Sequence, residues 1–417
     1  MLRRLSLAGI LLPFLSFAQM SSMNEAGMYL MNIASGTGMN PGSWPMPMLM
    51  RGAGSWMLMF MGQAFMIDTQ QSGPRGGDKL YSPNAFMLAA SHDLWGGTLQ
   101  FQSMISLEPL TIANRRYPEL FQTGETAYGH AIVDGQHPHN FAMGVGLDYA
   151  HALGDGAILQ FYYAPVGDPA LGPVAYPHRA SAEELPQAPL SHHWQDSTHI
   201  SADVATVAVK HSWFRLEASG FHGAEPGENR WTLPWGAMDS YSGRLSVAPS
   251  SNWTVQMSAG RVTHPEILSP GDVVRTTASI AYSKPMPNRE TWSTSLIWGR
   301  NHDTDTRRNL NSYLLESVYP FRRRNFLTGR IEYVDKDELF DDTPQLEAQL
   351  ERAAGSTFRI GAYTAGYTRD IGTFHMIETG IGANASVYTL PSAIQPYYGG
   401  RPWGVNVFLR LRLKPNR

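Results

Sequence analysis

The feature that most constrains the fold is a succession of segments, each roughly ten residues long, that run from residue 55 almost to the end of the chain and often alternate in polarity. In residues 405–413, valine and leucine alternate with asparagine, phenylalanine and arginine. In residues 213–219, Arg215 and Glu217 share one face while Leu216 occupies the other. A period of two places successive side chains on opposite faces of a strand. The pattern therefore predicts strands with one apolar and one polar face.

Turn residues such as glycine, proline, asparagine and serine separate these segments, and they divide the chain into about sixteen strands. The predicted strands are 55–69, 84–95, 97–111, 141–153, 156–165, 199–211, 213–223, 240–248, 253–262, 273–284, 290–300, 309–320, 324–335, 357–370, 374–388 and 404–414.

The predicted connections alternate in length. Those leaving odd-numbered strands are long, as at 112–140 and 166–198, whereas those leaving even-numbered strands are as short as Gly96 or Ser212. Loops sorted in this way, an even strand number and an apolar outer face are typical of a transmembrane antiparallel β-barrel. A soluble β-sandwich has no reason to sort its loops. We therefore expect an all-β chain whose sheet closes on itself, because closure gives every backbone group in lipid a partner.

Composition agrees with this expectation. Only 16% of residues are charged, against about a quarter in an ordinary soluble domain. The absence of cysteine excludes disulfides and thiolate metal sites. A net charge of −3 argues against a nucleic-acid partner. Beyond Ala18 the sequence contains no run of about 18 apolar residues, so helical membrane spans are not expected.

The amino-terminal residues have the layout of a secretory signal peptide. Arg3 and Arg4 precede a short apolar run, and small residues before Gln19 form a cleavage site. We therefore predict export and three regions: a signal peptide at 1–18, a methionine-rich periplasmic leader without an obvious strand at 19–54, and an outer-membrane barrel at 55–417.

The signal peptide, the strands across 55–414 and the sorted loops together resemble the porin-like outer-membrane β-barrels of bacteria. The resemblance covers nearly the whole mature chain, although it is architectural and rests on no specific motif. It implies a location in the bacterial outer membrane, contact with outer-membrane lipid, and passage or binding of a small solute or ion.

Methionine is unevenly distributed, because 13 of the 20 methionines lie in the first 66 residues. The densest piece is residues 44–50, where prolines favour an extended chain that leaves the thioethers accessible. Thioether sulfur is a soft ligand that favours Cu(I). Met46, Met48 and Met50 are therefore candidate ligands of copper or another soft metal.

Copper-resistance outer-membrane proteins of the B type also pair a methionine-rich leader with a barrel, and this chain resembles them in that arrangement over residues 19–66. The resemblance implies copper as the bound ion. The leader itself contains no histidine. The alternative is that the methionines pack adaptably, with one set on a single face of the first predicted strand: Met57, Met59 and Met61.

Histidine is concentrated in the long predicted loops, with ten of the 14 lying in these loops or at the adjoining strand ends. Imidazole is the commonest metal ligand, so residues from separate loops could converge on copper or zinc, with Asp134 and Asp196 orienting the rings. The alternative is that they are hydrogen-bonding surface residues. The candidate ligands are His137, His139, His192 and His193.

Two other functions remain open at this stage. Ser191, His192 and Asp196 lie close together in the sequence, as a hydrolase would need, but no G-x-S-x-G motif supports an enzyme. The other is a plain pore, whose inward-facing charges would hydrate the lumen or pair with one another. We expect a non-enzymatic barrel for a small solute or ion, with a soft metal as the most specific hypothesis.

Overall fold

The computed structural model describes residues 23–34, 36–266, 271–287, 290–340, 343–355 and 357–413. The predicted signal peptide at 1–18 lies outside the described residues, as does Lys414, the last residue of the final predicted strand.

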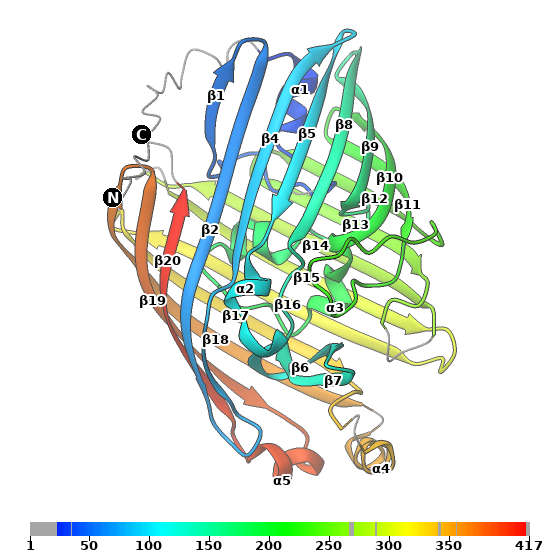
Figure 1. The fold of residues 1–417 in the computed structure, drawn as a ribbon, viewed down its shortest axis with the longest axis vertical. Helices are drawn as coiled ribbons and strands as arrows, with labels where there is room; N and C mark the ends of the chain where they lie inside the picture. The colour runs from blue at the N-terminus through cyan, green and yellow to red at the C-terminus, as the bar shows by residue number, and fades with distance from the viewer. Residues whose placement is uncertain are drawn as a thin grey trace, which may run out of the picture.

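Strands account for most of the secondary structure (Figure 1). They are β1 (Leu49–Ala53), β2 (Trp56–Gln71), β3 (Asp78–Tyr81), β4 (Asn84–Leu94), β5 (Gly97–Ile105), β6 (Tyr117–Ala127), β7 (His130–Gln136), β8 (Ala142–Gly154), β9 (Ala157–Gly167), β10 (Ser201–His211), β11 (Phe214–His222), β12 (Ser240–Ser250), β13 (Trp253–Val262), β14 (Val273–Pro285), β15 (Thr291–Asp303), β16 (Asn309–Phe321), β17 (Asn325–Lys336), β18 (Phe358–Phe374), β19 (Ile377–Thr389) and β20 (Trp403–Leu413).

The helices are short and lie in the connections or before the first strand. They are α1 (Glu25–Leu30), α2 (Glu108–Thr111), α3 (His192–Gln195), α4 (Pro344–Ala354) and α5 (Gln395–Tyr398). Single 3₁₀ turns occur at Ala113–Arg115, Tyr176–His178, Ala180–Ala182, Ser197–Ile200 and Ser392–Ile394. Within the described ranges, no helix has the length and apolar character needed to cross a membrane.

The sheet is antiparallel and closed. Neighbouring strands pair in chain order, except that the β6–β7 hairpin forms a separate sheet, and β20 returns to pair with β2. One edge of β2 carries β1 and β20 end to end, and the other carries β3 and β4. The eighteen-stranded sheet is therefore a barrel whose wall is sixteen strands around. The predicted fold class and strand number are confirmed.

The predicted strands match the observed ones closely, and the differences have local causes. The strand predicted at 97–111 ends at Ile105, because the chain turns into α2, where Asn84 accepts a hydrogen bond from the backbone of Leu107. The turn predicted at 371–373 lies instead between Phe374 and Ile377, because β18 continues past an irregularity in its register. The segment predicted to lack a strand contains both α1 and β1.

The connections are sorted as the sequence predicts. Two-residue turns such as that between β4 and β5 lie at one end of the barrel, which we call the short-turn end. The long connections and the helices α4 and α5 lie at the other, the long-loop end (Figure 1).

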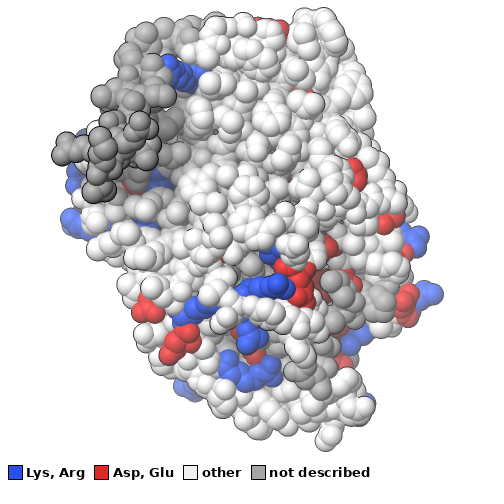
Figure 2. Space-filling model, viewed as in Figure 1, with Lys and Arg blue, Asp and Glu red and all other residues white. Residues whose placement is uncertain are grey.

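The outer face of the wall is apolar and the inner face is polar. Figure 2 shows a broad uncharged surface over β2, β4, β5 and β8, with charged side chains gathered toward the long-loop end. In β11, Leu216 is 58% exposed while Arg215 and Glu217 are buried in the interior. Large exposed side chains in other strands include Leu88, Phe161, Val207, Leu245, Met257, Ile280, Leu296, Leu315, Ile331, Ile381 and Val407. This is the polarity that a barrel in lipid requires.

Candidate functional site

The lumen is occupied by folded chain. Residues 168–200, the connection between β9 and β10, are almost entirely buried and lie inside the barrel; we call them the plug loop. A long connection in a bacterial barrel is ordinarily an external loop. The plug loop lies inside because its polar groups find partners on the inner wall: Arg179 pairs with Glu316 of β16, and the backbone carbonyl of His193 accepts a hydrogen bond from Arg275 of β14.

Inward-facing charges of the wall therefore form ion pairs. Arg410 of β20 pairs with Glu184 of the plug loop, and its neighbour Arg412 pairs with Glu183. Arg244 binds the carbonyl oxygen of Gly172 at 3.0 Å. Burying a charge is costly unless it is paired and hydrogen-bonded. These contacts hold the plug loop against both sides of the wall.

The leader also packs inside the wall, at the short-turn end. Tyr29 of α1 donates a hydrogen bond to Gln160 of β9 at 2.6 Å, and its ring packs with Ala150 and Ile158. Farther along, Asn40 donates to the carbonyl of His178 at 2.9 Å. The leader and the plug loop therefore contact one another within the lumen.

A pocket lined by thioethers lies between the leader and the strands β2 and β4. Its volume is about 20 Å³. Met46 and Met48 line it as the sequence analysis expected of candidate ligands, whereas Met50 lies in β1 opposite Met59 and does not line it. We call it the methionine pocket, after the residues Met31, Met46, Met48, Met59, Met61 and Met87.

Two further pockets adjoin the methionine pocket along β2 and β4. The next, of about 50 Å³, shares Met61 and Met87 with it and is also lined by His178. The third, of about 60 Å³, shares Gln63 with the second and is lined by His139. Each volume has room for only a few water molecules. The three pockets form a row that runs from thioethers to imidazoles.

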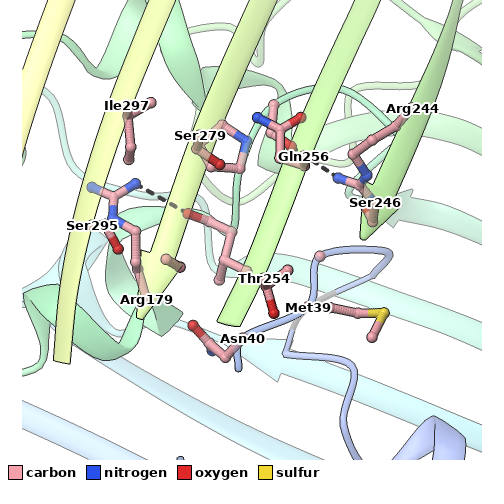
Figure 3. A pocket seen from close by; sticks show the side chains of 15 residues that line it. Met39, Asn40, Arg179, Arg244, Ser246, Thr254, Gln256, Ser279, Ser295 and Ile297 are labelled. Carbon is pink, nitrogen blue, oxygen red and sulfur yellow. Dashed lines mark hydrogen bonds between the residues drawn. The ribbon is translucent and has the colours of Figure 1, made fainter. Parts of the chain in front are cut away.

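A separate pocket lies between the leader, the plug loop and the strands β12 to β15 (Figure 3). Its volume is about 20 Å³. Arg179 and Arg244 approach it from two sides, and the strands contribute hydroxyl groups, among them Ser279 and Ser295, together with apolar side chains such as Ile297. The described residues that line this pocket include no group of histidine, aspartate or glutamate side chains that could hold a metal ion.

Five histidines come together in the lumen, and four of them are the candidates from the sequence. The centroid of the His192 ring lies 5.3 Å from that of the His193 ring and 5.2 Å from that of the His199 ring. His139 is 5.5 Å from His199, and His137 is 6.0 Å from His193. We call these five residues the histidine cluster.

Several of these rings are oriented by an acceptor at Nδ1. His192 contacts Asp196 at 2.6 Å, and His139 contacts Glu108 at 2.9 Å. A histidine that donates one ring N–H to a carboxylate keeps the other nitrogen free for a metal. Asp196 therefore has the orienting position that the sequence suggested. Asp134 does not, because it binds Arg75 and Tyr398 instead.

Burial favours the neutral form of four imidazoles in the cluster and of His178, which lines the second pocket. It lowers the pKa of His137, His178 and His192 to about 4, and it lowers the pKa of His199 well below the ordinary value. Burial alone would raise the pKa of Asp196, but the adjacent His192 and Arg179 hold that pKa below its ordinary value. Neutral imidazole is the form that binds a metal.

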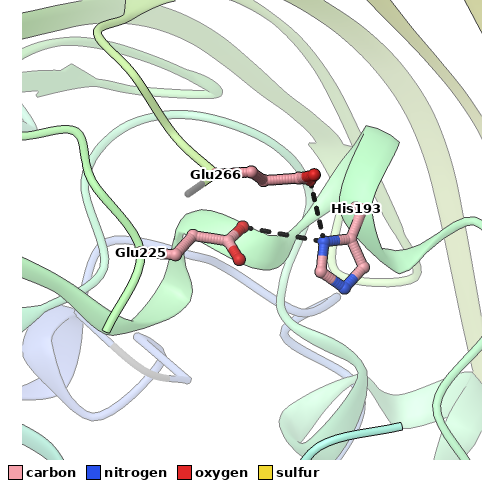
Figure 4. A group of neighbouring side chains, drawn as sticks. All are labelled: His193, Glu225 and Glu266. Carbon is pink, nitrogen blue, oxygen red and sulfur yellow. Dashed lines mark hydrogen bonds and ion pairs between the residues drawn. The ribbon is translucent and has the colours of Figure 1, made fainter. Parts of the chain in front are cut away.

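Among the histidine, aspartate and glutamate side chains of the described residues, one group of three brings its ligand atoms within 4.8 Å of one another: His193, Glu225 and Glu266 (Figure 4). Nδ1 of His193 lies 3.3 Å from Glu266 and 3.7 Å from Glu225. Burial, reinforced by the charge of Glu266, raises the pKa of Glu225 to about 8. The sequence analysis missed both glutamates, because they come from two other loops and carry no motif.

The serine beside the histidine cluster has a different partner. The hydroxyl of Ser191 donates to Glu332 of β17 at 2.9 Å. A Ser–His hydrogen bond of the kind that hydrolases use is not found in this group of described residues. Ser191 thus helps to anchor the plug loop.

Comparison with known proteins extends the description of the fold. No family model matches the sequence, and no curated protein matches it. Solved structures do match, among them the anion-selective porin from Comamonas acidovorans, with a TM-score of 0.54, 11% identity and coverage of 86% of this chain and 100% of the porin. OmpF of Salmonella typhi in complex with daunomycin matches with a TM-score of 0.52 and 9% identity, over 88% of this chain and 100% of OmpF. The outer-membrane channel DcaP of Acinetobacter baumannii matches with a TM-score of 0.50 and 8% identity, over 87% of this chain and 99% of DcaP.

The chain therefore has the fold of bacterial outer-membrane porins, as expected. The closed wall and its apolar outer face, together with this fold, place it in the bacterial outer membrane. The expected resemblance to copper-resistance proteins of the B type gains no support from the comparisons.

Proposed function

We propose that the protein is a porin-like barrel that binds and passes a small soft metal ion, with Cu(I) as the first candidate. The observation that supports this proposal is the row of three adjoining pockets, which begins with six methionines and continues past His178 to His139. Thioethers favour Cu(I), and imidazole suits copper and zinc. An ion could therefore exchange one set of ligands for the next along the row.

The size of the pockets supports an ion rather than a larger solute. Volumes of about 20 to 60 Å³ accommodate an ion with a few water molecules. The plug loop fills much of the remaining lumen and is tied to the wall by Arg410 and Arg412. The alternative is a porin-like channel without a metal role, in which the methionines only pack.

Cu(I) binding by the refolded protein tests the proposal, measured by competition with a chromophoric Cu(I) chelator. We expect the double variant Met46→Leu/Met48→Leu to bind Cu(I) much more weakly, because losing ligands should cost more than losing a group that orients a ligand, which alone costs about 10- to 100-fold. Methionine and leucine have similar volumes, so packing should be preserved.

Met50→Leu is the matched control, because Met50 belongs to the same segment and does not line the methionine pocket. Its Cu(I) affinity should equal that of the unsubstituted protein. Equal affinity in the double variant would refute the metal proposal. Steady conductance in planar bilayers without any Cu(I) binding would favour the alternative channel.

A further inference from the structure

The trio of His193, Glu225 and Glu266 lies away from the methionine pocket, near the long-loop end of the lumen. Its members come from three connections: α3 of the plug loop, the β11–β12 loop and the β13–β14 loop. Figure 4 shows both carboxylates directed at the same edge of the imidazole. We infer that these three side chains form a binding site for a borderline divalent metal ion, represented by Zn²⁺.

The ligand atoms are already close together. Nδ1 of His193 lies within 3.7 Å of an oxygen of each glutamate, and the three ligand atoms are all within 4.8 Å of one another. An ion at about 2.0–2.2 Å from a nitrogen and two oxygens needs only small side-chain movements from this arrangement. One imidazole and two carboxylates would leave a position open for water, and the set is harder than the six thioethers.

Unmet hydrogen-bonding capacity is the second observation. The side chain of Glu225 is only 9% exposed, yet the hydroxyl of Ser197 is the one hydrogen-bonding side chain near it among the described residues, and neither carboxylate oxygen forms a hydrogen bond of good geometry there. Nε2 of His193 is likewise buried without a partner among the described residues. Buried polar groups are normally satisfied, and each exception needs a cause. A cation between the glutamates would satisfy Glu225 and remove the repulsion between two like charges.

The nearby cations have other partners. The guanidinium of Arg275 donates to the carbonyl of His193 at 2.6 Å and to Ser197 at 3.0 Å. The ammonium of Lys336 donates to Gln122 at 3.1 Å. Within the described ranges neither residue forms an ion pair with Glu225 or Glu266. Their charges lie near the trio but leave its oxygens available.

A bound ion would join the plug loop to two outer loops, because each ligand belongs to a different connection. Metal binding at Nδ1 requires the tautomer of the neutral His193 ring whose single proton is on Nε2, so the proton that Nδ1 shares with Glu266 in the metal-free protein would be lost to solvent and Nε2 would take up one proton. The site is independent of the Cu(I) proposal, since none of its ligands lines the methionine pocket.

Zn²⁺ titration of the refolded, chelator-treated protein tests the site. We expect one Zn²⁺ per chain to bind with an affinity that falls by more than about tenfold in Glu225→Gln and in Glu266→Gln, because each loses a ligand. Glu228→Gln is the matched control: Glu228 lies in the same loop as Glu225 but pairs with Arg115 at the surface. Its affinity should be unchanged.

X-ray absorption at the zinc edge of the unsubstituted protein supplies a second, direct measurement. We expect one imidazole and otherwise oxygen ligands. Two or more imidazoles would assign the ion to other members of the histidine cluster and overturn the proposal. Equal affinity in all three variants, or no binding by the unsubstituted protein, would also overturn it. Both results can occur whether or not Cu(I) binds at the methionine pocket.

Discussion

At the scale of single residues, the histidine cluster depends on positions where a side chain is absent. Gly124 in β6 has a φ of +117°, and a Cβ there would lie 2.3 Å from Cε1 of His193. The imidazole therefore occupies space that only glycine leaves open. Gly129, in the turn between β6 and β7, also has a positive φ of +79°, but a Cβ there would meet nothing within 4 Å.

This difference predicts the result of two alanine substitutions. Both Gly124→Ala and Gly129→Ala strain the backbone, but only the first displaces the ring of His193. We expect Gly124→Ala to lower the free energy of unfolding by about 1–3 kcal/mol more than Gly129→Ala does, which is the usual cost of overpacking. Urea unfolding in lipid vesicles measures both. Equal losses would show that the ring moves aside freely.

At the scale of elements, the plug loop is stabilised by polar groups that must keep their charge state. The folded protein holds His137, His178 and His192 at pKa values of about 4 because they are buried, while an unfolded chain has histidines near about 6.5. Between these values the unfolded chain binds more protons than the folded one. This contribution to stability is therefore present above about pH 6.5 and is lost as the pH falls toward 4.

We therefore expect these histidines to lower the melting temperature of the metal-free protein in detergent as the pH falls from 7 to 5, against the opposite contribution of buried carboxyls such as Glu225, whose pKa is raised to about 8. His178→Gln removes part of the histidine contribution, so relative to the unsubstituted protein its melting temperature should shift upward between pH 7 and pH 5. His264→Gln is the control, since the side chain of His264 is 66% exposed. The same pH dependence in His178→Gln and in the unsubstituted protein would contradict the prediction.

The strands could be predicted from the sequence because the alternation of apolar and polar residues in many of them shows which side chains face the lipid and which face the lumen. In β17, Leu327 and Ile331 face outward and Arg330 faces inward, as the alternation indicates. The plug loop left no such signal. Its composition is that of an external loop, and its partners, such as Glu316 and Arg410, lie more than 130 residues away in the chain.

The candidate site was predictable only in part for the same reason. Residue type indicated His192 and His193, and their position in a long connection predicted that they could converge with histidines from separate loops. The glutamates that complete the trio, Glu225 and Glu266, are ordinary loop residues in the sequence. Met50 follows Met46 and Met48 closely in the sequence, but it lies within β1 and does not line the methionine pocket.

At the scale of the whole molecule, the wall has the opposite polarity to that of a soluble protein, because its apolar side chains face outward and its charged side chains face inward. Leu296 lies near the middle of β15 and is 52% exposed, whereas Leu153 is 60% exposed beside the turn between β8 and β9. The first should contact the hydrocarbon of the membrane, and the second should lie near its edge.

An arginine at each position should therefore have different effects. We expect Leu296→Arg to cost about 2–4 kcal/mol of unfolding free energy and Leu153→Arg about 0–1, because the cost of a charge on the lipid face depends on its depth. Unfolding from vesicles measures both. Equal costs would place the two side chains at the same depth and contradict the inferred position of the membrane.

The ion pairs between the plug loop and β20 also constrain the order in which the molecule is assembled. Arg410 and Arg412 belong to the strand that seals the wall, while their partners Glu183 and Glu184 are synthesised well over 200 residues earlier. If the seam closed around an empty interior, these two guanidinium groups would keep only the wall carboxylates of Asp370 and Glu378 as counter-charges. Completion of the cylinder is thus more favourable once the inner loop is in place, because Glu183 and Glu184 then supply the remaining ion pairs. The energy gained on adding the final strand therefore depends on the contents of the barrel.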